Sequence, residues 1–196
     1  MTRIVVLRHA PTAWNRDKRL QGRTDVALDE EGVAIAARWK IDPDWASYRI
    51  LSSPLGRARM TAAILFPDAE IGVDSRLIEM DFGTWEGQRL ADLRGQVGGD
   101  AAERERLGLD FRASDGESPR EVQARVLPLL ARLAELRRPT VLVCHQAVGR
   151  AIYALATGWT MIDKPPVKLR PNCAHVYVLA ADGMPAVERL NVSLEG

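Results

Sequence analysis

The sequence holds three histidines, and two of them, His9 and His145, each lie just after a short apolar run that predicts a strand. His9 is preceded by Arg8, and another arginine, Arg57, follows the Ser-Pro pair at positions 53 and 54. An imidazole nitrogen can act as a nucleophile or exchange protons near neutral pH. A guanidinium is permanently charged, and its fork of donors fits phosphate oxygens. These residue types together indicate chemistry on a phosphate group, whereas His175 is expected to be structural.

The apolar runs before these histidines predict strands that are buried on both faces. They cover Ile4–Leu7 and Val141–Cys144, and weaker strands are predicted at 49–51 and 71–73. Helical segments separate them, and this alternation predicts an α/β fold with a mainly parallel central sheet and helices on both faces. Near the end, 176–179 and 187–190 flank a turn and predict a hairpin at the sheet edge. We expect a single domain over residues 1–196, with ligands bound at the carboxyl ends of the strands.

Two helices are predicted from their start signals. Asp29 can cap a helix whose first turn holds two glutamates, where the helix dipole favours acids. Ser53 is expected to cap a second helix, with Pro54 at its first position and its end near Leu65. The N-termini after Ser53 and after His145 would then offer backbone N–H donors to an anion.

A longer helix is predicted from a capping box between Ser118 and Glu121. Pro128 lies inside it, and we expect a kink there. Residues 147–157 form a further predicted helix, with Gly158 as the residue that ends it. The apolar face of the longer helix comprises Val122, Val126, Leu129, Leu130, Leu133 and Leu136.

Composition excludes several classes of protein. With 27 basic and 26 acidic residues the net charge is +1, which gives no general attraction to nucleic acid or to an anionic membrane. An apolar content of 46% excludes intrinsic disorder. No apolar run approaches the roughly 20 residues of a membrane span, and the first one is too short for a signal peptide. Cys144 and Cys173 are expected to be free thiols, which predicts a cytoplasmic protein.

Five ordered blocks carry a family resemblance over residues 3–150. They read LRHAPTAWN, RLQGRTDVALDEEG, SSPLGRARMTA, LIEMDFGTWEG and VLVCHQAVGRA. The sequence resembles the histidine phosphatase (phosphoglycerate mutase-like) superfamily. The fourth block is similar to bacterial phosphatases of the α-ribazole phosphatase type. The stretch from GESPREVQARVLPLL to VLVCHQAVGRA is similar to the fructose-2,6-bisphosphatase domain of a bifunctional enzyme.

The resemblance implies a role for each matching residue. His9 would be the nucleophile that forms a phosphohistidine, and Glu79 would give a proton to the leaving oxygen and then take one from water. Arg8, Arg57 and a protonated His145 would hold the phosphoryl oxygens. Further contacts to the phosphoryl group or the pocket wall would come from Asn15, Gln21, Gly22 and the backbone N–H of Gln146.

These roles describe a phosphatase that needs no metal and no cofactor, because three cations can neutralise a dianionic monoester. Glu79 must start protonated, which predicts an acidic optimum unless the pocket or bound phosphate raises its pKa. The family's glycine and acidic residue after the first histidine are replaced by Ala10 and Pro11. Ala10 would be strained if the backbone there needed a positive φ, and Pro11 removes a backbone donor.

Three other interpretations are open. Cys144 and Arg150 have the spacing of a cysteine phosphatase loop, although that hypothesis leaves His9, Arg57 and Glu79 unexplained. A mutase would share the chemistry, but family mutases generally have a longer segment between the acid and the second histidine. A phosphate-binding module without turnover should lack one of the three reacting residues. We therefore expect hydrolysis of a small phosphomonoester, whose identity, like the oligomeric state, the sequence leaves open.

Overall fold

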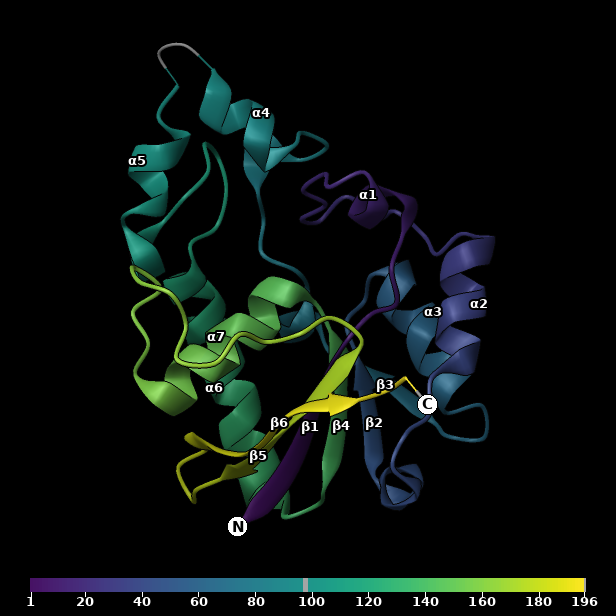
Figure 1. The fold of residues 1–196 in the computed structure, drawn as a ribbon. Coiled ribbons are helices and arrows are strands. Elements are labelled where there is room, and N and C mark those ends of the chain that lie inside the picture. The colour runs from purple at the N-terminus through teal and green to yellow at the C-terminus, as the bar shows by residue number, and fades with distance from the viewer. Residues whose placement is uncertain (97–98, 196) are drawn as a thin grey trace.

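A six-stranded sheet lies at the centre of the computed structural model, which describes residues 1–96 and 99–195 (Figure 1). Its strands follow the spatial order β3-β2-β4-β1-β5-β6. The first four in that order run parallel, and β5 and β6 are antiparallel to their neighbours. The parallel sheet and the C-terminal hairpin are thus confirmed. The strands are β1 (Thr2–Arg8), β2 (Arg49–Ser52), β3 (Ile71–Val73), β4 (Thr140–Cys144), β5 (Cys173–Leu179) and β6 (Pro185–Ser193).

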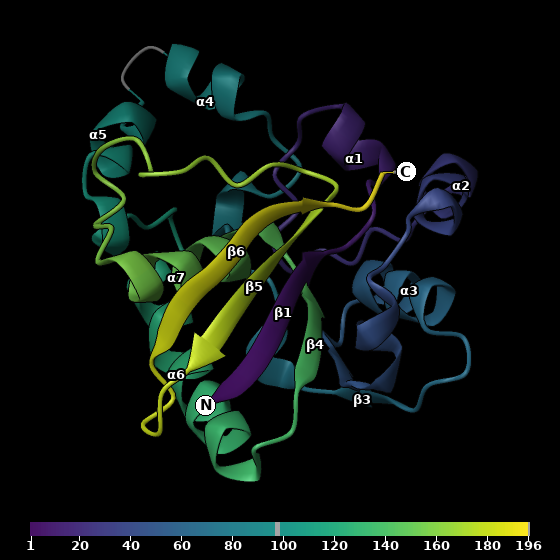
Figure 2. The ribbon, with the colours of Figure 1, turned by 60° about the horizontal axis from the view of Figure 1, so that its bottom comes forward.

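Side chains of β1 alternate between two buried clusters on the two faces of the sheet. Ile4 and Val6 pack on one side, whereas Val5 and Leu7 pack on the other. Each such side chain contributes about 1.5–3 kcal/mol to folding when it leaves water. Helices cover both faces, as expected (Figures 1 and 2). They are α6 (Pro119–Leu136) and α7 (Gln146–Thr157) on the first face, and α2 (Glu30–Arg38) and α3 (Gly56–Leu65) on the second.

The long helix α6 begins at the predicted capping box. The Ser118 side chain accepts from the N–H of Glu121, and the Glu121 carboxylate accepts from the N–H of Ser118. The helix continues through Pro128 to its end as one element. Leu136, in the last turn of α6, is 42% exposed, so the buried side of the helix ends before this predicted member of its apolar face.

The predicted start of α3 is wrong. The helix begins at Gly56, three residues after Ser53, and its capping residue Leu55 makes no side-chain hydrogen bond. The Ser53 hydroxyl accepts the N–H of Leu55 at 3.3 Å within a local turn and faces another partner, His145. The N–H of Gly56 donates to the Asp25 carboxylate, so it is not available to an anion.

The two edges of the sheet differ in length and regularity. The β3 edge has only three residues, whereas β6 has nine and is largely exposed. Its pairing with β5 shifts register near Ala174, Val176 and Tyr177, as in a β-bulge. Asn191 of β6 adopts a positive φ of 56°, which bends this strand locally.

Short helices lie beyond the carboxyl ends of the parallel strands, near the top of Figure 1. They are α1 (Ala13–Arg16), α4 (Leu90–Gly95) and α5 (Ala101–Glu105). Because strand ends in a parallel sheet leave a crevice there, these segments provide its outer walls.

Among residues 1–96 and 99–195, no helix is long and apolar enough to cross a membrane.

Candidate active site

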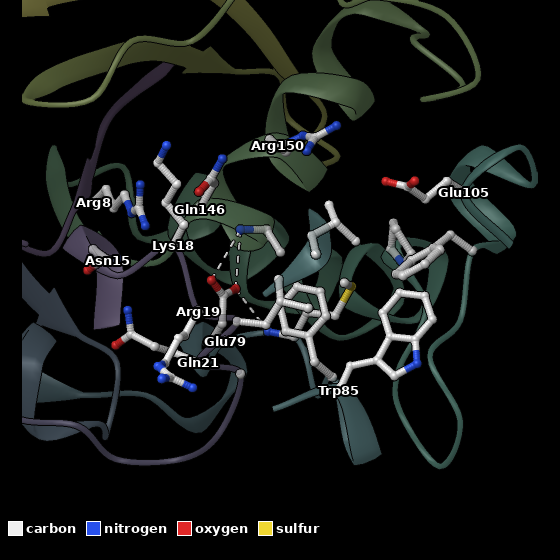
Figure 3. A pocket seen from close by; sticks show the side chains of 18 of the residues that line it. Arg8, Asn15, Lys18, Arg19, Gln21, Glu79, Trp85, Glu105, Gln146 and Arg150 are labelled. Carbon is white, nitrogen blue, oxygen red and sulfur yellow. Dashed lines mark hydrogen bonds between the residues drawn. The ribbon is translucent and has the colours of Figure 1, made fainter. Parts of the chain in front are cut away.

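A cavity of about 490 Å³ opens at the carboxyl ends of β1 and β4. Figure 3 shows Arg8, Asn15 and Gln21 on one side of it, Trp85 on the other, and Glu79 between them. Eight of the nine residues expected at the site line this cavity, and the ninth, His145, lies beside it. The eight are Arg8, His9, Asn15, Gln21, Gly22, Arg57, Glu79 and Gln146.

His9 follows β1 and is held in one orientation by the backbone. Its N–H donates to the carbonyl of Cys144 at 3.0 Å, and its ring Nδ1 lies 2.7 Å from the carbonyl of Ala10. A carbonyl can only accept, so Nδ1 carries the proton and Nε2 keeps its lone pair. Burial, together with the charges of Arg8 and Arg57, holds the pKa of His9 well below its ordinary value of 6.5. The ring is therefore neutral at neutral pH, with its lone pair on Nε2.

The replacement of the family's glycine by Ala10 fits the backbone. Ala10 is fully buried, and its φ is not among the positive values found in the described residues. Its N–H donates to the Thr61 hydroxyl at 3.0 Å. Ala10 is thus unstrained, and its carbonyl is the acceptor that orients His9.

His145 packs against His9, with ring centroids 5.1 Å apart and an angle of 58° between the ring planes. Its Nε2 lies 2.7 Å from the Ser53 hydroxyl, while Nδ1 is buried and has no partner among the described residues. Burial, His9 and the arginines hold the pKa of His145 well below 6.5, so this structure does not bear out the expected protonated ring. A neutral His145 that accepts from Ser53 at Nε2 carries its hydrogen on Nδ1.

The two predicted arginines differ in how they are held. Arg57 is fully buried, and it donates through Nη1 to the carbonyl of Thr24 at 2.8 Å and through Nη2 to that of Gly22 at 2.7 Å. Its Nε has no partner among the described residues. Arg8 is half-buried at the end of β1. Burial lowers the pKa of both groups, but a guanidinium stays protonated in proteins, so both are cations beside His9.

Glu79 is a buried carboxyl at the centre of the cavity wall. It accepts the N–H of Met80 at 2.9 Å and the N–H of Ala147 at 3.2 Å, drawn as dashed lines in Figure 3. The N–H of Ala147, in the first turn of α7, is therefore taken by Glu79 and is not available to an anion. Burial raises the pKa of Glu79 above its ordinary 4.5, although these hydrogen bonds and the nearby arginines oppose the shift. A raised pKa favours the protonated form that a general acid needs.

Arg125 of α6 positions the segment that leads into Glu79, a role the sequence did not reveal. Its guanidinium donates to the carbonyls of Arg76 and Ile78 and to the Glu117 carboxylate. In the sequence Arg125 belongs to the polar positions of an amphipathic helix, where a charged residue is ordinarily solvated. Only the fold brings residues 76–78 against it.

Glu86 was also missed, and it holds the loop that contacts Arg57. Its carboxylate accepts the N–H groups of Arg23 at 2.8 Å and Thr24 at 2.9 Å. Arg57 binds the carbonyls of this same loop, so the loop is fixed from both sides. Gly22 has a φ of +55°, and a Cβ there would lie 1.8 Å from a Glu86 carboxylate oxygen.

Cys144 does not have the environment of a reactive thiol. It is fully buried in β4, and burial raises its pKa to about 12. A nucleophilic cysteine needs a lowered pKa and access to solvent. Cys144 therefore packs as a small apolar strand residue, and the cysteine phosphatase interpretation loses its nucleophile.

The fold and the site together define an α/β protein with a pocket at the strand ends that is lined by histidine and arginine side chains. A family model described as the histidine phosphatase superfamily (branch 1) matches residues 4–193. The chain belongs to this family.

Relatives of the chain include both mutases and phosphatases. A probable phosphoglycerate mutase of Salmonella arizonae is 32% identical over 183 residues, covering 89% of this chain and 83% of the relative. A mycobacterial glucosyl-3-phosphoglycerate phosphatase has a TM-score of 0.79 at 26% identity, covering 98% of this chain and 100% of that one. The α-ribazole phosphatase of Shigella flexneri has a TM-score of 0.82 at 24% identity, covering 100% and 98%, and supports the fold.

Proposed function

We propose that this protein hydrolyses small phosphomonoesters through a phosphohistidine at His9. The observation that carries the proposal is a neutral His9 with its Nε2 lone pair kept free by the Ala10 carbonyl, in one cavity with buried Glu79. The named phosphatase among the structural relatives supports hydrolysis. The direction of both pKa shifts favours the same starting state, with the nucleophile neutral and the acid protonated.

The first step transfers the phosphoryl group to histidine. Nε2 of His9 attacks phosphorus, the bond from phosphorus to the leaving oxygen breaks, and Glu79 gives its proton to that oxygen. The second step reverses the role of the carboxylate. Glu79 takes a proton from water, the water oxygen bonds to phosphorus, and the bond from phosphorus to Nε2 breaks to release phosphate.

The donors around His9 would hold the phosphoryl oxygens. Nε of Arg57 and Nδ1 of His145 are buried without a hydrogen-bond partner among the described residues, and both, like the guanidinium of Arg8, can donate. Donors fixed in place before the reaction stabilise charge in the transition state at little reorganisation cost. Asn15, Gln21, Gly22 and Gln146 would contact the phosphoryl group or shape the cavity around it.

The charge that these groups supply is the reason to propose that neither metal nor cofactor is required. Two guanidinium groups beside His9 can neutralise a dianionic ester. Among the described residues no group of three or more His, Cys, Asp or Glu could hold a metal ion.

The test is p-nitrophenyl phosphate hydrolysis from pH 4.5 to 8.5 with excess EDTA. Wild type, His9→Ala and Cys144→Ser are compared, the last as a control in which the reacting histidine is kept. We expect activity to survive EDTA and Cys144→Ser and to vanish in His9→Ala. Acid-quenched wild type should also hold phosphate on His9, detected by mass spectrometry of the peptide. Activity in His9→Ala, or loss of activity in EDTA that only added metal restores, would contradict the mechanism.

A mutase is the second candidate, favoured by the probable phosphoglycerate mutases among the relatives. A mutase would return the phosphoryl group to the substrate and not to water. Incubation with 3-phosphoglycerate separates the two: a phosphatase releases inorganic phosphate, whereas a mutase yields 2-phosphoglycerate. Phosphate binding without either product would instead indicate a binding module.

A further inference from the structure

A second cavity, of about 670 Å³, adjoins the candidate active site. It shares Arg8, Gln146 and Arg150 with the first cavity, and His145 lines it as well. Much of its remaining wall comes from residues 158–172, which we call the cationic segment. Both cavities lie in the size range of sites for small ligands, and they meet along the first turns of α7.

The charge of the second cavity is one-sided. Among the residues the structure describes, its wall includes no Asp or Glu. None of its cations forms an ion pair with a described residue, whereas exposed arginines elsewhere do, such as Arg94 with Glu105 at 2.6 Å. Like charges gathered without partners repel, and an anion between them offsets that cost. The cations are Arg8, Arg150, Lys164, Lys168 and Arg170.

Hydrogen bonds from the body of the protein hold the cationic segment in place. The N–H of Val167 donates to the Tyr153 hydroxyl at 2.8 Å. Asn191 accepts the N–H of Arg170 at 2.7 Å and donates to the carbonyl of Lys168 at 3.0 Å. Buried Tyr153 belongs to α7 and Asn191 to β6, so two elements of the fold fix the backbone that carries these charges.

Arg150 connects the two cavities. It lines both of them, and its guanidinium lies 5.1 Å from the centre of the Trp159 ring, a cation–π contact. Gln146 lies one turn earlier on the same face of α7. A ligand that reaches from His9 past Gln146 would therefore meet Arg150 and then the cationic segment.

We propose that the second cavity binds a second anionic group of the substrate. The preferred substrates are then phosphomonoesters whose leaving group itself carries a carboxylate or another phosphate. This inference rests on the proposed function, because it places the first phosphoryl group at His9. Exposed charge pairs are weak one by one, so the discrimination comes from several cations together.

The test compares esters that differ in one anionic group. One pair is 3-phosphoglycerate and glycerol 3-phosphate, and the other is glucose 1,6-bisphosphate and glucose 6-phosphate. Wild type should have a higher kcat/KM for the doubly anionic member of at least one pair. Lys164→Met, Lys168→Met and their double variant keep most of the side-chain length and remove charge. We expect the double variant to lower that kcat/KM by ~25-fold, roughly fivefold for each charge, and to leave the singly anionic member unchanged.

Lys40→Met is the matched control, because Lys40 is exposed and lines neither cavity. If the double variant lost kcat/KM equally on both members of a pair, or on neither member, the proposal would be overturned. A change in p-nitrophenyl phosphate hydrolysis by sulfate in wild type only, with no charge preference in either pair, would assign the cavity to a separate anion and also overturn the proposal.

Binding separates this proposal from the proposed function. In His9→Ala, calorimetry should show tighter binding of the doubly anionic member, and the two lysine substitutions should abolish the difference. Preferential binding without turnover by wild type would support the second-anion site and contradict the phosphatase. Turnover of both members without preference would support the phosphatase and contradict the second-anion site.

Discussion

Glu79 and His9 are placed so that burial shifts their pKa values in opposite directions. Burial raises the pKa of the carboxyl above 4.5 and lowers that of the imidazole below 6.5. Hydrolysis needs a neutral His9, present above the lowered pKa, and a protonated Glu79, present below the raised one. For an alkyl phosphate, whose leaving oxygen needs that proton, we therefore predict that kcat/KM falls as pH rises through the raised pKa of Glu79. This alkaline limb lies above the position that an unshifted carboxyl would give, and a pH profile measures it.

The substitution Glu79→Gln tests the role of Glu79 as the proton donor. We expect it to lower the rate on an alkyl phosphate by roughly 10²–10⁴ and to remove the alkaline limb. p-Nitrophenolate leaves without a proton, so this variant should give a rapid burst of p-nitrophenol and then slow turnover. A Glu79→Gln profile that keeps the wild-type limb would assign that limb to another group.

Gly22→Ala tests the loop between Arg57 and Glu86. The new side chain would adopt a positive φ and displace the Glu86 carboxylate. We expect a loss of about 1–2 kcal/mol in the free energy of unfolding, together with lower activity, because Arg57 loses an anchored carbonyl. Gly95→Ala is the control, since a Cβ there has no neighbour within 4 Å. Denaturant unfolding of the two variants should differ; equal effects would refute the argument.

At the residue scale, the sequence predicted which side chains meet but not their protonation or supports. His9 and His145 could be identified because each follows an apolar run that ends at the same edge of the sheet. The neutral state of His145 depends on burial against His9 and two arginines, which is a property of the folded site. Glu86 and Ser53 act through contacts to distant segments, and no local pattern reveals those contacts.

At the element scale, α6 does more than cover the sheet, because Arg125 ties the segment before Glu79 to this helix. We predict that Arg125→Met lowers kcat by up to about tenfold with little change in KM and shifts the alkaline limb of the pH profile. It should also cost about 1–3 kcal/mol of stability, since the Glu117 carboxylate and two carbonyls lose a donor.

Arg132→Met serves as the control on the same helix. Arg132 forms an exposed pair with Glu135, so its removal should change neither stability nor kinetics appreciably. If Arg125→Met lost stability but kept the wild-type pH profile, Arg125 would be structural only and would not position Glu79.

Helix positions were predicted better than helix starts. The capping box at Ser118 involves only neighbouring residues, so local sequence is enough to place it. Ser53 and Pro54 form an equally good local signal, yet the hydroxyl of Ser53 faces His145, 92 positions away in the chain. A tertiary hydrogen bond of this kind overrides a local preference.

At the scale of the whole molecule, ligand binding should stabilise the fold because the donors that would bind phosphate come from separate elements. Inorganic phosphate at 100 times its dissociation constant should add about 2.7 kcal/mol, or about 5–10 °C in Tm. Arg8→Met should reduce this shift strongly, whereas Arg59→Met, on an exposed position of α3, should keep it. An equal shift in both variants would exclude Arg8 from the phosphate site.

The architecture was predictable because buried parallel strands and amphipathic helices leave strong periodic patterns. Continuous apolar runs at β1 and β4 marked the centre of the sheet, and the hairpin signal marked its end. The second cavity was not predictable, because its wall combines β1, α7 and the cationic segment, which has no periodic pattern. Its lysines are indistinguishable in the sequence from solvated surface charges.

The two sheet edges also bear on self-association. A long, regular, apolar edge strand can pair with another chain and begin aggregation. Here β3 is too short to offer such an edge, and β6 is bulged and carries Glu188 and Arg189 at exposed positions. Irregular geometry and charge therefore protect the side of the sheet that the hairpin leaves open. The same bend at Asn191 that anchors the cationic segment helps to keep copies of this protein from joining strand to strand.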